Sequence, residues 1–433
     1  MKRGHKIDRQ KYDHFLHILK EELVPAMGCT EPIAVAYAAA LAAAELPGRP
    51  ERVEICVSSN IIKNVKSVIV PNTDGMHGLE AAAAAGIVAG DPTNKLLVIS
   101  QVTPEQKKDI EDYLKTAHFS VEESHTGEVF DICIRLTAGA HTSLCRIAGD
   151  HTNVVQVVRD GEVQQEKSLQ KPEIEKQAAE MEICDIVAFA DEVEIPDVAP
   201  ILDRQITCNM DIAQEGLTRN YGARIGQVLL ACREPSVYTK AKAYAAAASD
   251  ARMGGCEKPV VINSGSGNQG ITASVPVIVY ARELGLPQEK LYRALVVSNL
   301  TTIHLKQGIG PLSAYCGAIS AGCGAAAGIT YLLGGGYEQV AHTVVNAIAI
   351  NSGVICDGAK ASCAAKIASA VEAGLLGMEM YRQGSEFVGG DGIVSKGVER
   401  TIRNVYRLAA QGMRLTDSEI ISIMLSDQQD RCS

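Results

Sequence analysis

The chain has 433 residues, a net charge of −10 and 46% hydrophobic residues. This length accommodates two or three domains, and an acidic balance without any basic tract argues against a nucleic-acid partner. Tryptophan is absent and only five phenylalanines occur, so we expect a core of Ala, Val, Ile and Leu in closely packed helices.

The cysteines and the N-terminus indicate the cellular compartment. The 13 cysteines form no repeating pattern, and the first residues, M-K-R-G-H-K-I-D, are polar rather than a signal peptide's apolar core. We therefore predict a cytoplasmic protein whose thiols stay free or bind metal. Two uncharged stretches, 307–337 and 340–356, are rich in Gly, Ala, Ser, Asn and Thr. That composition favours buried helices over membrane spans.

The first 50 residues predict helices. Tyr12, Phe15 and Leu19 recur at helical spacing, and an Ala-rich segment follows Pro32, a residue favoured in the first turn of a helix. Cys29 is therefore expected at or just before a helix N-terminus. Gly48 and Pro50 end the helical pattern.

Residues 51–170 predict a mixed α/β domain. The segments R-V-E-I-C-V-S-S, L-L-V-I-S-Q-V, F-D-I-C-I-R-L-T-A and N-V-V-Q-V-V-R-D-G-E-V have the composition of strands. Asp160-Gly161 predicts a hairpin turn. Segments 79–89 and 104–117 predict helices between these strands.

Residues 171–433 return to a helical pattern, in which only V-V-I-N-S before Gly265 resembles a strand. The predicted fold class is α+β, a largely helical catalytic core with an inserted mixed α/β domain. The expected domains are N-terminal helices packing on the core (1–50), the inserted domain (51–170) and a helical iron–sulfur catalytic domain (171–433). Cys29 can join a site in the last domain only if the first segment packs against it.

Three late cysteines are the strongest candidates for metal ligands. Cys316, Cys356 and Cys363 lie in S-A-Y-C-G-A and I-C-D-G-A-K-A-S-C. Thiolates bind iron–sulfur clusters and zinc, and three of them leave one position of a four-coordinate site open for chemistry. Their spacing matches no common zinc or ferredoxin motif. The other late cysteines, including Cys323, fit the ordinary role of small buried hydrophobic residues.

A glycine-rich segment provides candidate substrate contacts. The loop from Gly265 to Gly270 fits G-x-G-x-x-G, which leaves three interpretations: a dinucleotide loop, a tight turn in the core, or backbone amides that bind a carboxylate. The last assigns substrate contacts to Ser264, Ser266, Gly267, Asn268 and Gln269. Arg252, shortly before the loop, either binds a carboxylate or pairs with Asp250.

Other polar groups are weaker candidates. Asn60, Lys63 and Asn64 follow a predicted strand, and segment 151–153 lies between strand signals. Each set either lines the site or forms a solvated loop. Asp357 and Lys360, beside Cys356, either tune a bound cluster or pair with each other.

Four motifs carry a family resemblance. M-G-C-T-E-P, D-A-R-M-G-G, S-G-S-G-N-Q-G-I-T-A and I-C-D-G-A-K-A-S-C together resemble the L-cysteine desulfidases, which belong with serine dehydratase alpha-chain-like proteins. The later part is also similar to the catalytic domain of iron–sulfur L-serine dehydratases. Those enzymes have a longer C-D-P segment, whereas this chain has C-D-G-A-K-A-S-C without the proline. The resemblance therefore favours the desulfidase branch.

The resemblance implies a [4Fe–4S] cofactor and the roles of the site residues. Cys316, Cys356 and Cys363 match the three cluster ligands, and Cys29 matches the proposed proton-accepting cysteine. A thiolate at a helix N-terminus is stabilised by the helix dipole, although Glu31 opposes this. Cys29 could instead be a fourth cluster ligand, which would leave no open iron, or have a structural role.

The implied activity is that of an L-cysteine desulfidase, a carbon–sulfur lyase that converts L-cysteine and water to pyruvate, ammonia and hydrogen sulfide. The alternatives are an L-serine dehydratase and a non-catalytic iron–sulfur or zinc protein that senses redox state or cysteine. The expected partner is a small amino-acid substrate, with no nucleic acid and no membrane. Gly- and Ala-rich helices are equally compatible with a monomer and a homo-oligomer.

Overall fold

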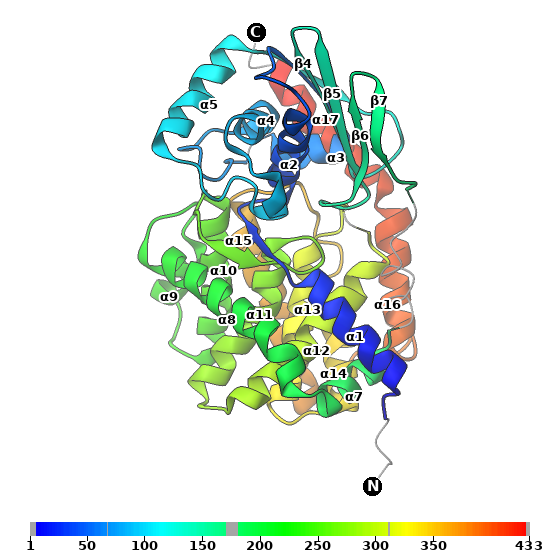
Figure 1. Cartoon of the computed structure of the whole chain (residues 1–433). Coiled ribbons are helices and arrows are strands. Elements are labelled where there is room, and N and C mark those ends of the chain that lie inside the picture. The colour runs from blue at the N-terminus through cyan, green and yellow to red at the C-terminus, as the bar shows by residue number, and fades with distance from the viewer. Residues whose placement is uncertain (1–5, 67, 170–180, 311, 430–433) are drawn as a thin grey trace.

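The computed structural model describes residues 6–66, 68–169, 181–310 and 312–429. Helices form 59% of it and a six-stranded mixed sheet is inserted, which confirms the predicted α+β class. The sheet and the helices that cover it lie at one end, and a body of packed helices lies at the other (Figure 1).

The helices of the described residues account for most of the chain. They are α1 (Arg9–Glu22), α2 (Thr30–Ala44), α3 (Ser59–Val65), α4 (Gly78–Ala89), α5 (Pro104–Thr116), α7 (Ile183–Glu192), α8 (Ile195–Thr218), α9 (Ile225–Cys232), α10 (Val237–Met253), α11 (Gly267–Glu283), α12 (Gln288–Gln307), α13 (Gly317–Leu332), α14 (Tyr337–Asn351), α15 (Ser362–Arg382), α16 (Val398–Arg407) and α17 (Arg414–Gln429). A 3₁₀ helix, η1 (Pro92–Leu97), and a π-helical turn, η2 (Leu408–Gly412), complete the set.

The strands fall into two sheets. They are β1 (Pro25–Met27), β2 (Arg52–Val57), β3 (His118–Glu123), β4 (Asp131–Ala138), β5 (His141–Ala148), β6 (Val154–Arg159), β7 (Glu162–Glu166) and β8 (Pro259–Val261). The larger sheet has the order β3-β2-β4-β5-β6-β7, with β2 and β3 parallel and the remaining neighbours antiparallel. Asp160 and Gly161 have φ values of 48° and 82° and join β6 to β7, as the hairpin signal predicts.

The larger sheet buries one face under helices. Val53, Ile55 and Val57 alternate along β2 and are at most 1% exposed, because successive strand residues point to opposite faces. Helix α2 contacts β4, β5 and α4, so it packs with the sheet, whereas α1 contacts α8 and α12 of the helical body. The division into domains at residues 50 and 170 remains a prediction.

One predicted strand is wrong. Residues 96–102 begin in η1 and continue as turns, although Leu96, Val98 and Ile99 are buried as a strand core would be. Asp91 caps the segment by accepting from the Thr93 N–H, and its own N–H donates to the Val98 carbonyl. An apolar run alone does not distinguish a strand from a buried turn.

The helical body depends on close approach between small residues. A Cβ on Gly322 of α13 would lie 2.5 Å from the Ala370 carbonyl oxygen of α15, and a Cβ on Gly374 would lie 2.6 Å from that of Gly322. Both contacts are too short for any side chain larger than hydrogen. The Gly- and Ala-rich composition therefore produces the tight helix packing that the sequence predicts.

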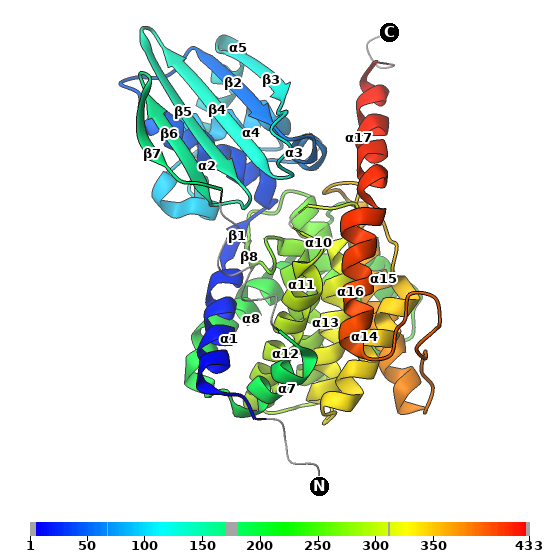
Figure 2. The same cartoon turned by 90° about the vertical axis from the view of Figure 1, so that its right-hand side faces the viewer.

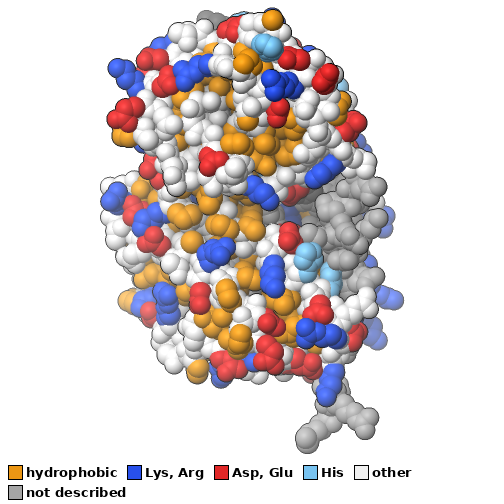
Figure 3. All heavy atoms as spheres, in the orientation of Figure 1, with side chains coloured by type: hydrophobic (Ala, Val, Ile, Leu, Met, Phe, Trp, Pro, Cys, Tyr) orange, Lys and Arg blue, Asp and Glu red, His pale blue; other side chains and the backbone are white. Residues whose placement is uncertain are grey.

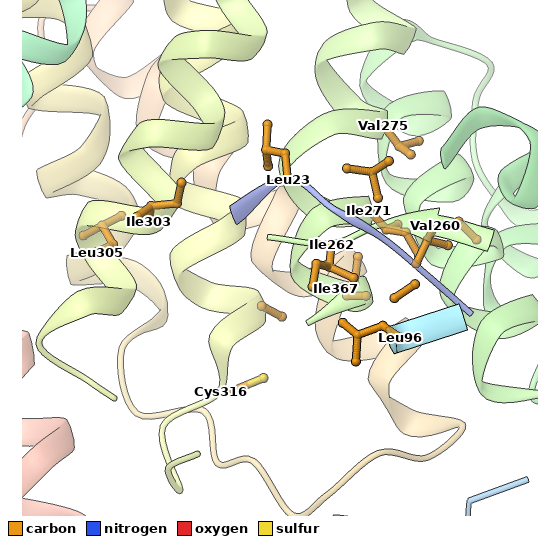
Figure 4. Close-up of a cluster of buried hydrophobic side chains, with 14 of the residues drawn as sticks. Leu23, Leu96, Val260, Ile262, Ile271, Val275, Ile303, Leu305, Cys316 and Ile367 are labelled. Carbon is orange, nitrogen blue, oxygen red and sulfur yellow. The ribbon is translucent and has the colours of Figure 1, made fainter. Parts of the chain in front are cut away.

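Short elements join the two ends of the molecule. Strands β1 and β8 pair antiparallel between the sheet end and the helical body (Figure 2). Leu96 of η1 lies in one buried cluster with Val260, Ile262 and Ile303 (Figure 4). Residues from the first hundred of the chain are thus packed against residues beyond 250.

The surface and the helix lengths bear on partners. Lys, Arg, Asp and Glu side chains are interspersed over the face drawn in Figure 3, with no extended basic patch on that face. Within the described ranges, no helix combines the length and apolar character that crossing a bilayer requires.

Candidate active site

A cavity of about 100 Å³ lies where the first segment of the chain meets the helical body. It joins residues from α2, α3, the end of α10, the glycine loop, α12 and the cysteine-bearing segments. The polar and cysteine side chains in its lining are Cys29, Glu31, Lys63, Asn64, Arg252, Ser266, Asn268, Gln269, Lys306, Ser313, Tyr315, Cys316, Cys356, Cys363 and Lys366. The structure therefore brings the three late cysteines and Cys29 to one cavity.

Two of the late cysteines are held on adjacent backbone segments. Tyr315 and Ile355 form an antiparallel bridge. The Cys316 N–H donates to the Val354 carbonyl at 3.0 Å, and the Cys356 N–H donates to the Ala314 carbonyl at 2.6 Å. Reciprocal backbone hydrogen bonds of this kind fix the register of the two segments. Both thiols consequently point into one volume before any ligand binds.

The third cysteine is delivered by a glycine-dependent turn. Gly358 has φ +94°, and a Cβ at this position would lie 2.7 Å from the Lys63 carbonyl oxygen. Only glycine tolerates that combination of φ and close approach. After the turn, α15 begins at Ser362, and the Cys363 thiol lies 3.7 Å from the Gly358 carbonyl oxygen.

The late thiols differ in their acidity. The Cys356 pKa lies below its ordinary value, first because Cys316 donates to it and further because of the Gly358 N–H and the Lys63 and Lys306 charges. The Cys316 pKa lies well above its usual value, because its proton is shared with Cys356 and because the thiol is buried. Burial also raises the Cys363 pKa. Cys356 is thus the thiol most ready to exist as a thiolate.

The arrangement of these thiols fits a cluster better than a single ion. Among the described residues, the only His, Cys, Asp and Glu group whose ligand atoms all lie within 4.8 Å of one another is Glu182, Cys184 and Asp185. Cys316, Cys356 and Cys363 do not form such a group, so at least one pair of their sulfur atoms is more than 4.8 Å apart. A cubane cluster holds each thiolate on a different iron and needs wider spacing.

Four cationic side chains lie in the same lining as the thiols, which suits an anionic cluster. Lys63, Arg252, Lys306 and Lys366 all line the cavity. A cluster with three thiolate ligands is an anionic group, and nearby positive charge compensates for its burial. No local sequence pattern marks Lys306 or Lys366, since both are isolated lysines within helical segments.

Cys29 occupies the N-cap position of α2, at the helix N-terminus as predicted, but its side chain makes no capping hydrogen bond and its thiol is not acidic. Burial raises the pKa of the Cys29 thiol well above its ordinary value, and the Glu31 carboxylate raises it further. The thiol donates a hydrogen bond of 3.0 Å to Glu31 Oε2. The expected stabilisation of a thiolate by the helix dipole is therefore outweighed, and Cys29 is a protonated thiol paired with a carboxylate.

Arg252 reaches the cavity across a glycine. A Cβ on Gly267 would lie 2.3 Å from Arg252 Nε, so the guanidinium rests on the first residue of α11. Its Nε is buried and has no partner among the described residues. The alternative pairing with Asp250 is not found, because Asp250 accepts from the Gly226 N–H instead. Arg252 is thus available to bind a carboxylate.

The glycine loop contributes only part of its predicted set. Ser266, Asn268 and Gln269 line the cavity, whereas Ser264 faces a second cavity and Gly267 serves as the support for Arg252. The loop runs into the first turn of α11, but the strand before it, β8, pairs antiparallel with β1. This topology differs from the parallel βαβ unit of a dinucleotide fold.

Of the remaining polar candidates, some line the cavity and others lie outside it. Lys63 and Asn64 line it, whereas Asn60 does not. The Lys63 side chain is 1% exposed and forms an ion pair with Asp417 of α17. Asp357 pairs with both Lys360 and Lys366. These pairs show that charges beside the cysteines have structural partners.

Comparison with known proteins assigns the chain to a family. Residues 93–422 match the serine dehydratase alpha chain family. A UPF0597 protein of Desulfitobacterium hafniense (strain Y51) is 55% identical over 420 residues, covering 96% of this chain and 97% of that protein. A UPF0597 protein of Treponema denticola is 45% identical over 432 residues, covering 97% of this chain and all of that protein. A UPF0597 protein of Bacteroides thetaiotaomicron is 39% identical over 417 residues, covering 94% and 96%.

Proposed function

Because the chain belongs to the serine dehydratase alpha chain family, we propose that it is a lyase that converts L-cysteine and water to pyruvate, ammonia and hydrogen sulfide. The observation that carries this proposal is the convergence of four cysteines on one cavity. Cys29 lies there with its Glu31 partner, opposite the group formed by Cys316, Cys356 and Cys363.

The cavity selects a small anionic substrate. Its volume of about 100 Å³ is well below the roughly 300–1,000 Å³ of pockets that hold drug-sized ligands. Arg252 has an unpartnered Nε and binds the substrate carboxylate through its fork of donors. Ser266, Asn268 and Gln269 supply further hydrogen bonds. This arrangement fixes the α-carbon near Cys29.

Cys29 and Glu31 together move the α-proton. Glu31 accepts the proton of the Cys29 thiol along their 3.0 Å hydrogen bond only as the substrate reacts. Because burial and Glu31 raise the pKa of the Cys29 thiol, the thiolate formed at that moment is a strong base, and it accepts the proton from the substrate α-carbon. The electron pair of that C–H bond forms the Cα–Cβ double bond while the Cβ–S bond breaks. The departing hydrosulfide takes the proton held by Glu31 and leaves as hydrogen sulfide, which restores the Glu31 carboxylate, while Cys29 keeps the proton from the α-carbon. The enamine left behind then hydrolyses in water to pyruvate and ammonia.

Cys316, Cys356 and Cys363 would hold a [4Fe–4S] cluster as its three thiolate ligands. When bound, the cluster supplies a Lewis-acidic iron without a protein ligand, suited to a sulfur leaving group. The lysines around the cysteines balance the charge of the thiolates, and burial limits access of water to the reacting atoms.

L-serine dehydration is a second candidate because the matching family is described by that substrate. The chemistry of Arg252, Cys29 and Glu31 applies equally to a hydroxyl leaving group. The two reactions differ in the leaving group, so anaerobic assays of pyruvate from L-serine and of pyruvate with sulfide from L-cysteine separate them. Faster turnover of serine than of cysteine would overturn the desulfidase assignment.

Exchange of the α-proton tests the role of Cys29 directly. In deuterated water, the wild-type protein should exchange the α-proton of unreacted substrate for deuterium or carry the substrate on to elimination. Cys29→Ala should show neither exchange nor elimination. Cys323→Ala is the matched control, because Cys323 is buried in α13 outside the cavity, and it should retain turnover. Unchanged elimination in Cys29→Ala would show that another group removes the proton.

A further inference from the structure

A second cavity lies beside the candidate active site. Its volume is about 380 Å³, larger than the catalytic cavity. It is formed between the loop joining β5 to β6, the end of α1, the tip of the glycine loop and the C-terminal end of α12. Its polar lining includes the carboxylates of Glu21, Glu22 and Asp150, the His151 ring, and Lys306 and Gln307 of α12.

The glycine loop is the wall between the two cavities. Ser264 and Gly265 face the second cavity, while Ser266 and the residues after it face the first. The loop is closed by reciprocal backbone hydrogen bonds between Asn263 and Ser266, and Ser264 holds an unfavourable φ of +49°. Lys306 lines both cavities, so the two volumes share one cation.

Two residues of the second cavity's lining carry buried polar atoms that no described residue satisfies. His151 is 4% exposed and its Nε2 has no hydrogen-bond partner among the described residues. The ring is fixed against Gly265, whose Cβ would lie 3.0 Å from His151 Cε1, and against the Phe130 ring. The buried Nε2 amide nitrogen of Gln307 likewise has no described partner. Buried polar groups are almost always hydrogen-bonded, so these point to a ligand.

The lining indicates the chemistry of that ligand. The donors of the lining are the Lys306 ammonium, the Gln307 amide and the His151 ring, which suit a carboxylate. The Asp150 carboxylate lies 3.9 Å from His151 Nδ1 and leaves His151 Nε2 without a described partner. Val24, Leu96, Ile262 and Ile303 form an apolar wall, and the carboxylate of Glu21 lies in the lining on α1. A molecule with a carboxylate, an ammonium and an apolar side chain larger than that of cysteine matches all three features.

We propose that this cavity is a second binding site, specific for an apolar L-α-amino acid and separate from the catalytic cavity. His151 and Gln307 bind the carboxylate with Lys306, Glu21 binds the ammonium, and the side chain packs on the apolar wall. Because Lys306 belongs to both cavities, the bound amino acid alters the charge available to the catalytic one. Binding itself does not depend on the proposed reaction.

Isothermal titration calorimetry of L-leucine into the anaerobically prepared full-length protein tests the site. One molecule should bind per chain, whereas 4-methylpentanoate, which lacks the ammonium, should bind more weakly. Gln307→Leu should weaken leucine binding by roughly tenfold or more, because a hydrogen bond to a charged group is lost. His151→Leu should have a similar effect. Gln164→Leu is the matched control on exposed β7 and should bind as wild type does.

Arg252→Met separates the two cavities, since it disables the catalytic one and should leave leucine binding intact. The proposal is overturned if wild type binds no leucine, or if binding is lost in Arg252→Met and kept in Gln307→Leu. Gln307 lies outside the catalytic cavity, so the basal turnover of Gln307→Leu should match wild type. A protein that binds leucine but turns over neither cysteine nor serine would refute the proposed function and leave this site standing.

Discussion

Single residues around the catalytic cavity are constrained by close contacts. Gly358 allows close approach of the Lys63 carbonyl, and Gly267 allows close approach of the Arg252 guanidinium. A Cβ on Gly317 would lie 2.6 Å from Gln269 Cδ. These glycines place two side chains and one backbone carbonyl that the sequence pattern cannot place, because close approach to a residue far away in the chain leaves no local signal.

Gly267→Ala tests the support of Arg252. The new methyl group would clash with Arg252 Nε at 2.3 Å and displace the guanidinium, so we expect KM for the amino-acid substrate to rise at least tenfold. Overpacking should also lower the free energy of unfolding by roughly 1–3 kcal/mol. The control is Gly48→Ala, which has open space around it and should change neither quantity. An unchanged KM in Gly267→Ala would contradict the role given to Arg252.

Asp250 makes stability depend on pH. Burial raises its pKa to about 6, although the Gly226 N–H opposes this, and its Oδ1 has no described partner. The folded state thus binds a proton more tightly than the unfolded state, whose Asp pKa is about 3.9. Stability from this group is present at low pH and is lost as pH rises from about 4 to 6.

Asp250→Asn should remove that contribution, since a neutral amide does not titrate. The unfolding midpoint of the variant should then rise relative to that of wild type as the pH is raised from 4 to 7. Thermal unfolding followed by circular dichroism measures this difference. A difference in unfolding midpoint that stays constant from pH 4 to 7 would contradict the raised pKa of Asp250.

Among the elements, those with strong internal patterns were predictable and those set by distant contacts were not. The helices α4 and α5 and the strands β2, β4 and β6 follow from periodicity and composition. Strand β3, H-F-S-V-E-E, was missed because an edge strand with polar faces lacks the apolar signal. The run 96–102 was wrong because its burial comes from tertiary packing rather than from a sheet.

An ion pair links α17 to Lys63 of the catalytic cavity, and the neighbouring Lys66 donates to the Met424 carbonyl of α17. Lys63, 1% exposed, pairs with Asp417, whose side chain is 16% exposed. Removing Asp417 leaves the more deeply buried charge unpaired, so Asp417→Asn should lower the free energy of unfolding by roughly 3 kcal/mol, and Lys63→Met should cost less. Urea titration checks this order. A larger loss in Lys63→Met would mean that the lysine has another essential partner.

At the scale of the whole molecule, the cavity exists because both halves of the chain meet. The sequence indicates that Cys29 can join the late cysteines only if the first segment packs against the last domain, with the sheet domain inserted between them in the chain. Strands β1 and β8 and the buried cluster around Leu96 provide that meeting. The position of Glu31 against Cys29, and of Lys306 between two cavities, arises only in this assembly and had no sequence signal.

Removal of the metal should loosen the molecule locally. The segments 312–318 and 354–363 converge on the candidate ligands and contain mostly irregular backbone, whereas β2 and β4–β6 are held by continuous ladders. Hydrogen exchange should therefore increase in the two cysteine segments after anaerobic chelation and remain unchanged in the sheet. Uniform exchange changes across the chain would indicate that the metal site supports the global fold instead.

Iron and acid-labile sulfide counted in four anaerobically purified single-cysteine variants test the central claim. The account predicts about four irons per wild-type chain. Cys316→Ala, Cys356→Ala and Cys363→Ala should each lose most of that iron, while Cys29→Ala should keep it and lose turnover. Full iron in the first three variants, or zinc without labile sulfide in wild type, would contradict the account.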